Sequence, residues 1–405
     1  MKPQALEPES SGSAGPAPVP EPTATPADVP AGRGNTGRTL ERRLRRGLAR
    51  VLVGALRPRP VDPRQLAAAG IGHLLVIRQH NQMGDMVLGL PALRALRRAY
   101  PRAHLTFVTG PMCEALLQGH PDIDRLVVYR KQEMWRPWSL WAFVRGLRRP
   151  RPDLAVVLGA VSFSTTSALL AWASGARVRV GVTSRPFGSE LSRALYHFEL
   201  PLGAEILHEV EHNLAPLRSL GLVAPVEPPV LVPRPDAVER ARTFLEAAFA
   251  AEGVTDGARR PVVVVHAGAG KRANIWPPQH FASVARTLVA AHGARVVLTE
   301  GPHDVGIVST LIDRLPGAAR WRAGLGDTLG LLALADLCIA NDTGMAHVAA
   351  AVGAPTVVVF GPTDARRWAP AGKRVRAVLS RTGRIEDANV ADVLDAARSL
   401  LCTDV

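Results

Sequence analysis

Cysteine is scarce in this 405-residue chain: Cys113, Cys338 and Cys402 lie far apart and form no Cys-x-x-Cys pair. The sequence therefore offers neither a disulfide framework nor a cysteine-based zinc site, and it suits a reducing compartment. The first residues contain no apolar stretch of the length that a secretory signal requires. We therefore expect a cytoplasmic protein, long enough for two domains of ordinary size.

Aromatic residues make up only 5% of the chain, and lysine occurs only four times beside 45 arginines. We find no interleaving of basic and aromatic residues that would form a stacking platform for bases, so no nucleic-acid partner is expected. The net charge of +14 is instead attributed to an acidic substrate or to contact with an anionic membrane surface.

Long uninterrupted apolar runs are also missing. The nearest candidate for a membrane span is the uncharged segment 154–176, which the polar stretch SFSTTS interrupts. Because a span needs roughly 20 apolar residues, a buried strand followed by a helix is the preferred interpretation.

The N-terminal region is rich in proline, alanine, serine and glycine over residues 1–36, a composition that cannot bury enough apolar surface to fold. We predict a disordered tail there and an amphipathic helix over residues 37–60, where leucine and valine recur at helical spacing. Between Arg38 and Arg59 lie eight arginines and one glutamate, a net charge of +7. Such a helix either lies peripherally on the inner-membrane surface or docks on its own domain.

From His73 onward, short apolar runs alternate with helical patterns, which predicts an α/β protein with parallel sheets. Strands are expected near residues 73–78, 104–108, 125–128, 154–159 and 177–182, and again within 261–268, 294–301, 336–342 and 355–363. The proline-rich stretch APVEPPVLVPRP separates the two runs, and a helix is predicted at 236–252. We predict two similar α/β domains, 73–220 and 230–385, with a cleft between them, and a C-terminal helix within 386–405.

Three loops that follow predicted strands carry polar residues, and open parallel sheets bind their ligands at that edge. In the first loop, QMGDMVLGLPALRALR, Gly84 permits a close backbone approach and Asp85 stands at the start of a helix. Asp85 is either the helix N-cap or a general base that removes a proton from an acceptor hydroxyl.

The second loop, HAGAGKRANIWPP, combines glycine with positive charge. Gly268 and Gly270 leave backbone amides unobstructed, and Lys271 and Arg272 add cations before a pair of prolines opens a helix. The spacing is not that of a Walker loop. The two cations either contact a phosphate or are ordinary solvated loop charges.

The third loop is NDTGMAH, in which Asp342, Thr343 and Gly344 surround the start of a helix. The free amides and the positive dipole end of that helix attract a diphosphate. Asp342 would repel a phosphate, so sugar hydroxyls or the loop's own amides are its expected partners. His347 falls opposite the apolar stripe of the helix, and we expect its side chain to face the cleft.

Together these loops resemble glycosyltransferase family nine, the ADP-heptose:lipopolysaccharide heptosyltransferases, over about residues 73–385. The resemblance rests on three segments in this order: GDMVLGLPALRALR, HAGAGKRANIWPPQHF and NDTGMAHVAAAVGAPTVVVFGPT. It implies a GT-B fold of two Rossmann-like domains, the first holding mainly the acceptor and the second mainly the nucleotide sugar. It also implies inversion at the anomeric carbon without a metal or other cofactor.

The resemblance further implies individual roles, with Asp85 as the general base. Donor contacts are expected from Gly268, Gly270, Lys271, Arg272, Asn274, Asp342, Thr343, Gly344 and His347. An acidic residue after the VVLT strand holds the adenosine ribose in this family; Glu300 and Asp304 compete for that role, and we favour Asp304. Many members carry a lysine where this chain has Asn274, and Lys271 or Arg272 would have to supply that charge.

We therefore expect a peripheral enzyme of the cytoplasmic face that transfers heptose from ADP-heptose to an acidic, lipopolysaccharide-core-type acceptor. One alternative keeps the fold and uses another nucleotide sugar or another glycan or small-molecule acceptor. An NAD-dependent oxidoreductase is disfavoured because no G-x-G-x-x-G follows the first strand. A non-catalytic binding module with the same fold is the third possibility.

Overall fold

A computed structural model describes residues 58, 61, 70–80, 82–159, 163–187, 189–201, 208–250 and 259–402. These residues all belong to one compact unit, Ala49–Val405. The predicted tail (1–36) and basic helix (37–60) fall outside the described residues, apart from Pro58.

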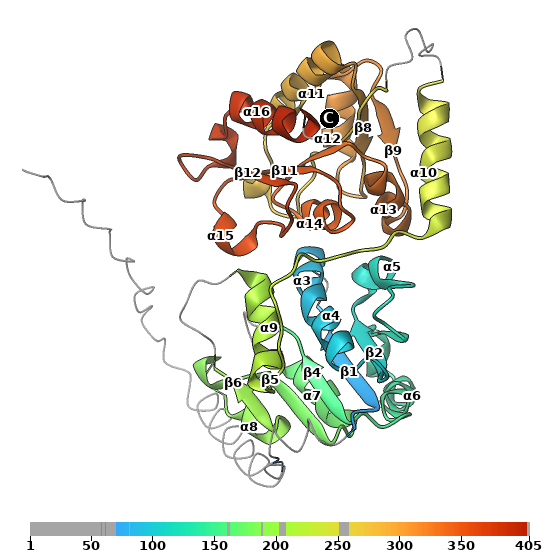
Figure 1. The fold of residues 1–405 in the computed structure, drawn as a ribbon, viewed down its shortest axis with the longest axis vertical. Coiled ribbons are helices and arrows are strands. Elements are labelled where there is room, and N and C mark those ends of the chain that lie inside the picture. Colours follow the sequence, from blue (N-terminus) through green and yellow to red (C-terminus); the bar gives the residue numbers. More distant parts are fainter. Residues whose placement is uncertain are drawn as a thin grey trace, which may run out of the picture. The chain divides into compact units, whose positions relative to one another are not determined.

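The first half of the unit forms a six-stranded parallel sheet in the order β3-β2-β1-β4-β5-β6 (Figure 1). Its strands are β1 (His73–Arg78), β2 (His104–Thr109), β3 (Arg125–Val128), β4 (Leu154–Val157), β5 (Val178–Val182) and β6 (Phe198–Leu200). Its helices are α3 (Met83–Leu88), α4 (Leu90–Ala99), α5 (Glu114–Leu117), α6 (Pro137–Leu147), α7 (Thr165–Ala173), α8 (Leu191–Leu195) and α9 (Glu209–Ser219), with short 3-10 turns η1 (Pro111–Cys113), η2 (Glu133–Trp135) and η3 (Arg185–Phe187).

The second half repeats this plan as a parallel sheet in the order β12-β11-β10-β7-β8-β9. Its strands are β7 (Val262–His266), β8 (Arg295–Thr299), β9 (Ala319–Trp321), β10 (Leu337–Asn341), β11 (Thr356–Phe360) and β12 (Val375–Leu379). Its helices are α10 (Pro235–Ala248), α11 (Pro278–His292), α12 (Val305–Arg314), α13 (Leu325–Ala333), α14 (Gly344–Ala351), α15 (Ala365–Trp368) and α16 (Val390–Leu401), with η4 (Arg272–Asn274) and η5 (Ile385–Asp387).

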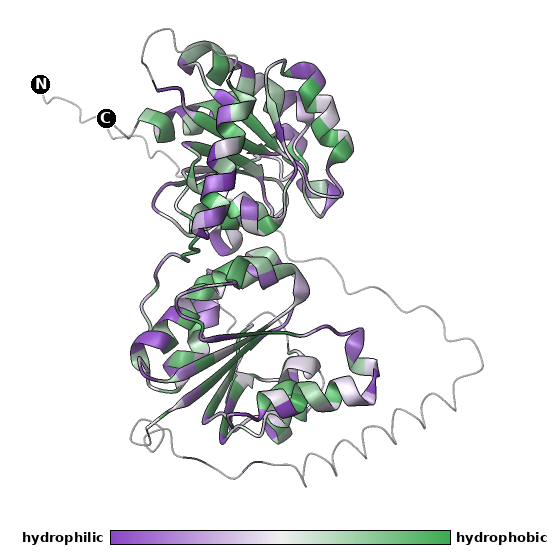
Figure 2. Cartoon of the chain, turned by 90° about the vertical axis from the view of Figure 1, so that its right-hand side faces the viewer, coloured by the Kyte–Doolittle hydropathy of each residue, from purple (hydrophilic) through white to green (hydrophobic). Residues whose placement is uncertain are grey.

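The central strands are continuous apolar runs because helices cover both faces of each sheet. In β7, Val263 and Val265 face the cluster formed with α11, α12 and α16, whereas Val264 faces the opposite layer with α13 and α14. Figure 2 shows these strands as hydrophobic arrows between helices with hydrophilic outer faces. The predicted strands and the strand-then-helix interpretation of 154–176 are confirmed by β4 and α7 and their neighbours. No described helix is long and apolar enough to cross a membrane.

Strand order places the three polar loops at the middle of each sheet. In the first sheet the order in which strands are added changes direction between neighbours β1 and β4, and in the second sheet it does so between neighbours β10 and β7. Such reversals leave a crevice at the carboxyl ends of the strands, where α/β proteins bind ligands. β1 leads to Asp85, β7 leads to Gly268, and β10 leads to Asp342.

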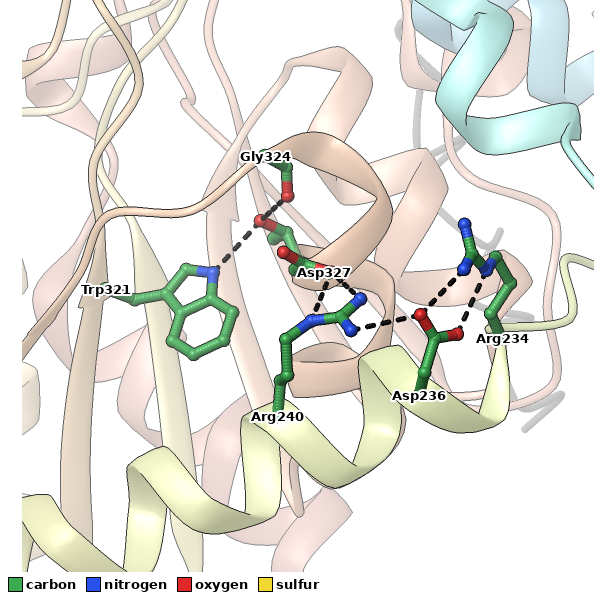
Figure 3. Close-up of polar contacts among 7 residues, drawn as sticks. Arg234, Asp236, Arg240, Trp321, Gly324 and Asp327 are labelled. Carbon is green, nitrogen blue, oxygen red and sulfur yellow. Dashed lines mark hydrogen bonds and ion pairs between the residues drawn. The ribbon is translucent and has the colours of Figure 1, made fainter.

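One side of the second sheet is closed by α10, which packs along α13 (Figure 3). Asp236 accepts hydrogen bonds from Arg234 and Arg240, and Arg240 also pairs with Asp327 of α13. Beneath this exposed network, the Trp321 indole donates to the Thr328 hydroxyl at 3.0 Å. The prediction of a helix near 236–252 is therefore confirmed, although α10 ends at Ala248.

Candidate active site

Asp85 lies in the first turn of α3, which begins at Met83 after the N-cap residue Gln82. The expectation that Asp85 occupies the N-cap position is wrong, because its backbone is already helical at the third position. Its carboxylate lies 3.8 Å from the guanidinium of buried Arg78, and about a fifth of the Asp85 side chain is exposed. Asp85 therefore has one open side and one cationic neighbour.

Arg78 connects Asp85 to a second carboxylate. Its guanidinium donates to the side-chain oxygen of Asn213 at 2.6 Å, and the negative charges of Asp85 and Glu209 both raise its pKa. Burial has the larger effect and lowers the Arg78 pKa. Glu209 is fully buried and also pairs with Arg367 from the second half of the unit at 3.3 Å. Arg78, Asn213 and Glu209 were not predicted from the sequence, because Arg78 lies more than 130 positions before the other two.

The turn after β10 is held by Asn341, a further residue to which the sequence alone gave no role. Its fully buried amide donates to the carbonyl of Ala267 at 2.8 Å, and its oxygen accepts from the backbone N–H of Trp276 at 3.0 Å. One side chain thus bridges the turn after β10 and both ends of the loop after β7. This bridge brings together the second and third predicted loops.

Asn274, an expected donor contact, is placed beside Asp342. The side chain is buried, and its amide nitrogen donates to the backbone and carboxylate oxygens of Asp342 at 3.2 and 2.9 Å. Asn274 thus holds Asp342 in position, and its donor contact stays a prediction.

The carboxylate of Asp342 is available to a ligand because Thr343, and not Asp342, caps helix α14. The N-cap of α14 is Thr343, whose hydroxyl accepts from the N–H of Met345 at 3.3 Å. Burial raises the pKa of the Asp342 carboxyl, while the Thr363 hydroxyl and the charge of Lys271 lower it. Lys271 and Arg272 are exposed, and neither forms an ion pair with another described residue. Both are free to meet an anionic group.

Gly268 and Asp304 are also adjacent. A side chain at Gly268 would collide with the Asp304 carboxylate, so the loop after β7 and the start of α12 are in contact. Asp304 accepts from the N–H of Gly301 at 3.0 Å. Glu300, its competitor, is 3% exposed and engaged by Arg320 and Arg322. Glu300 is thus occupied by two arginines, and Asp304 stays the predicted residue for the ribose. Gly270 has open space where a side chain would be.

His347 does not point into an open cleft, which corrects that expectation. It is 5% exposed, and its ring packs on Gly84, where an added Cβ would lie 2.9 Å from Cδ2 of His347. On the other side of the same contact, an added Cβ at Gly344 would lie 2.7 Å from Cβ of Met83. The two glycines thus let α3 and α14 touch. Asp85 follows Gly84 directly, so it lies one residue from the contact with the turn that carries Asp342 and Thr343.

Burial, with a smaller contribution from the charge of His208, lowers the pKa of His347 to about 4. The native imidazole therefore stays neutral below pH 6.5, where the unfolded chain takes up a proton. The free energy of unfolding should fall as pH drops from about 6.5 to 4, by about 3 kcal/mol from this residue. Urea titrations across this range should give a flatter pH profile for His347→Gln than for exposed His303→Gln. Equal slopes in both variants would contradict this assignment.

Comparison with known proteins agrees with this geometry. Residues 140–397 match the model of glycosyltransferase family 9 (heptosyltransferase). Lipopolysaccharide heptosyltransferase 3 of Escherichia coli is 27% identical over 71% of this chain and 83% of its own length. Lipopolysaccharide heptosyltransferase 2 of E. coli K12 is 26% identical over 74% of this chain and 86% of its own.

Solved structures show the same fold. A family 9 glycosyltransferase from Veillonella parvula superimposes with a TM-score of 0.72 at 20% identity, covering 85% of this chain and 99% of that one. E. coli ADP-heptose heptosyltransferase II gives 0.65 at 22% identity, covering 82% and 98%. The chain belongs to glycosyltransferase family 9. It is a glycosyltransferase with the GT-B arrangement of two parallel sheets.

Proposed function

We propose that the protein transfers a heptose from ADP-heptose to an acidic acceptor of the lipopolysaccharide-core type, with inversion and without a metal. The observation that carries the proposal is the contact between α3 and α14, which sets Asp85 beside the turn that holds Asp342, Thr343 and Gly344. Relatives named as lipopolysaccharide heptosyltransferases, and a similar E. coli heptosyltransferase structure with ADP, support this donor and acceptor class.

The proposed reaction forms one bond and breaks one. Asp85 accepts the proton of the acceptor hydroxyl while its oxygen attacks the anomeric carbon from the face opposite the nucleotide. The bond from the anomeric carbon to the diphosphate oxygen breaks, and ADP leaves. Lys271, Arg272 and the free amides at the start of α14 stabilise the negative charge that develops on the diphosphate. Exclusion of water around the site would protect the donor from hydrolysis.

Two further roles in the proposal concern the donor. Asp304 would hold the adenosine ribose, since Glu300 is occupied by two arginines. Asp342, oriented by Asn274, would accept hydrogen bonds from sugar hydroxyls. The alternative of another nucleotide sugar keeps the same chemistry and differs only in these contacts.

A thermal-shift panel tests the donor assignment. ADP and ADP-heptose should raise the melting temperature, since a ligand at 100 times its Kd stabilises the native state by about 2.7 kcal/mol. UDP and NAD should give little or no shift. Lys271→Gln should reduce the ADP shift, whereas Lys373→Gln, another exposed lysine of the same half, should not. A larger shift with UDP than with ADP would replace ADP-heptose by a uridine donor.

A further inference from the structure

The segment after β3 exposes an unusual number of tryptophans. Trp135 is 82% exposed, Trp138 69% and Trp141 62%. Trp172 of neighbouring α7 is 40% exposed, whereas the remaining three tryptophans, all in the second half, are buried or partly buried. Trp135, Trp138, Trp141 and Trp172 are called the tryptophan face below. In water this face would expose large apolar rings, and exposed apolar patches of this kind mark interaction sites.

Helix α6 divides its residues between two sides. Phe143 packs edge-on against Tyr129, with ring centroids 5.6 Å apart, and Leu147 is buried. Trp138, Trp141 and Arg145, at spacings of three and four residues, lie on the outer side. The Arg145 guanidinium stacks 4.9 Å from the Trp141 ring centroid. The inner side therefore anchors α6 on the sheet, and among the residues that the structure describes none covers Trp138 or Trp141 on the outer side.

The same segment is strongly basic. Residues 130–151 contain seven arginines or lysines and one glutamate, a net charge of +6. Arg130 pairs with Glu114 and Glu133, but Lys131 and Arg136 meet no acidic side chain in the described parts of the chain. The expectation that basic and aromatic residues do not interleave is thus wrong for this segment. Its charge complements an anionic surface.

We propose that the tryptophan face docks on an anionic phospholipid bilayer. Indole rings favour the boundary between headgroups and acyl chains, where the apolar ring is buried and the N–H stays hydrated. Lys131 and Arg136 would lie against lipid phosphates. Single-stranded nucleic acid fits less well, because its binding proteins stack bases along a groove, whereas these exposed rings are spread over η2, α6 and α7.

The position of this face suits a lipid-borne acceptor. Turn η2 follows β3 at the carboxyl edge of the first sheet, the same edge at which β1 leads to Asp85. An acceptor held in the bilayer would therefore meet the protein at the edge that carries the general base. This inference extends the proposed function by naming a membrane-binding surface. Its test measures no transfer, so either proposal can fail without the other.

Quenching by brominated lipids tests which residues touch the bilayer. Residues 1–134 contain no tryptophan, so the segment 37–60 adds no signal even if it also binds membrane. With vesicles of equal parts brominated phosphatidylcholine and phosphatidylglycerol, the full-length chain should lose roughly a third or more of its emission. The variant Trp135→Phe/Trp138→Phe/Trp141→Phe should bind the vesicles and lose much less. Binding of the unmodified chain without quenching would overturn the proposal.

Vesicle sedimentation tests the role of charge. Lys131→Gln/Arg136→Gln should weaken binding to the anionic vesicles roughly tenfold or more. The matched variant Arg314→Gln/Arg381→Gln, with the same charge change on the second half, should bind like the unmodified chain. Unfolding midpoints of all variants should agree. Equal losses in both double variants, or tighter binding to oligo-deoxythymidine than to vesicles, would overturn the bilayer as the partner.

Discussion

Replacement of Asp85 by asparagine should lower kcat by about three orders of magnitude while leaving ADP affinity nearly unchanged. The amide keeps the shape of the side chain but cannot accept the acceptor's proton. Buried Arg78 would lose one of its carboxylate neighbours and keep Glu209. The protein should therefore still fold and bind nucleotide.

Steady-state transfer assays with ADP binding measured in parallel check this prediction. Asp122→Asn is the matched control, because Asp122 is a mostly buried carboxylate of the same half that also pairs with an arginine, Arg94, at 3.5 Å. The control should transfer sugar at close to the original rate. Full turnover by the Asp85 variant would exclude this residue as the base. Loss of ADP binding together with turnover would assign it to the donor site instead.

The largest effect on stability is expected from Gly330→Ala. Gly330 lies in α13 where that helix crosses α10, and an added Cβ would collide with the backbone of Ala237 and lie 2.7 Å from the N–H nitrogen of Val238. Backbone atoms cannot move aside as a flexible side chain can. We expect the free energy of unfolding to fall by roughly 3 kcal/mol or more, and α10 to separate from α13.

Gly326→Ala, in the same helix, is the control for this substitution. Its added Cβ would lie 3.8 Å from Cβ of Ala115, an ordinary contact. Alanine favours helix over glycine by up to about 1 kcal/mol, so this variant should be as stable as the original chain or slightly more stable. Chemical unfolding of both variants measures their free energies of unfolding and so tests the prediction. Similar stabilities would mean that α10 and α13 are not packed as closely as described.

The sequence alone predicts the central strands well, for a physical reason. Strands β1, β4, β7 and β10 are buried on both faces, so each is a continuous apolar run. Of the four edge strands, β3 was predicted, and β6, β9 and β12 were not. Two of them have only three residues, and β12, with the sequence VRAVL, exposes three of its five residues. A strand with one neighbour needs fewer apolar residues, and its signal is correspondingly weak.

The loops were located correctly, but the roles inside them depend on distant partners. Asn274 was predicted as a donor contact, and its hydrogen bond to Asp342, 68 positions away, could not be read from the sequence. His347 sits on the polar side of its helix by periodicity, yet α3 covers that side through Gly84. Asn341 donates to the carbonyl of Ala267, 74 positions earlier in the chain. No pattern within one helix or loop contains that information.

The positions of β1, β7 and β10 bear on how such an enzyme can diversify. All three loops leave strands at the interior of a sheet, whereas β3, β6, β9 and β12 are edge strands. Because an edge strand pairs with one neighbour only, insertions or deletions beyond β9 or β12 leave the pairing of β7 and β10, which lead to Lys271 and Asp342, in place. The margin of the second sheet can therefore vary between relatives while its centre is preserved.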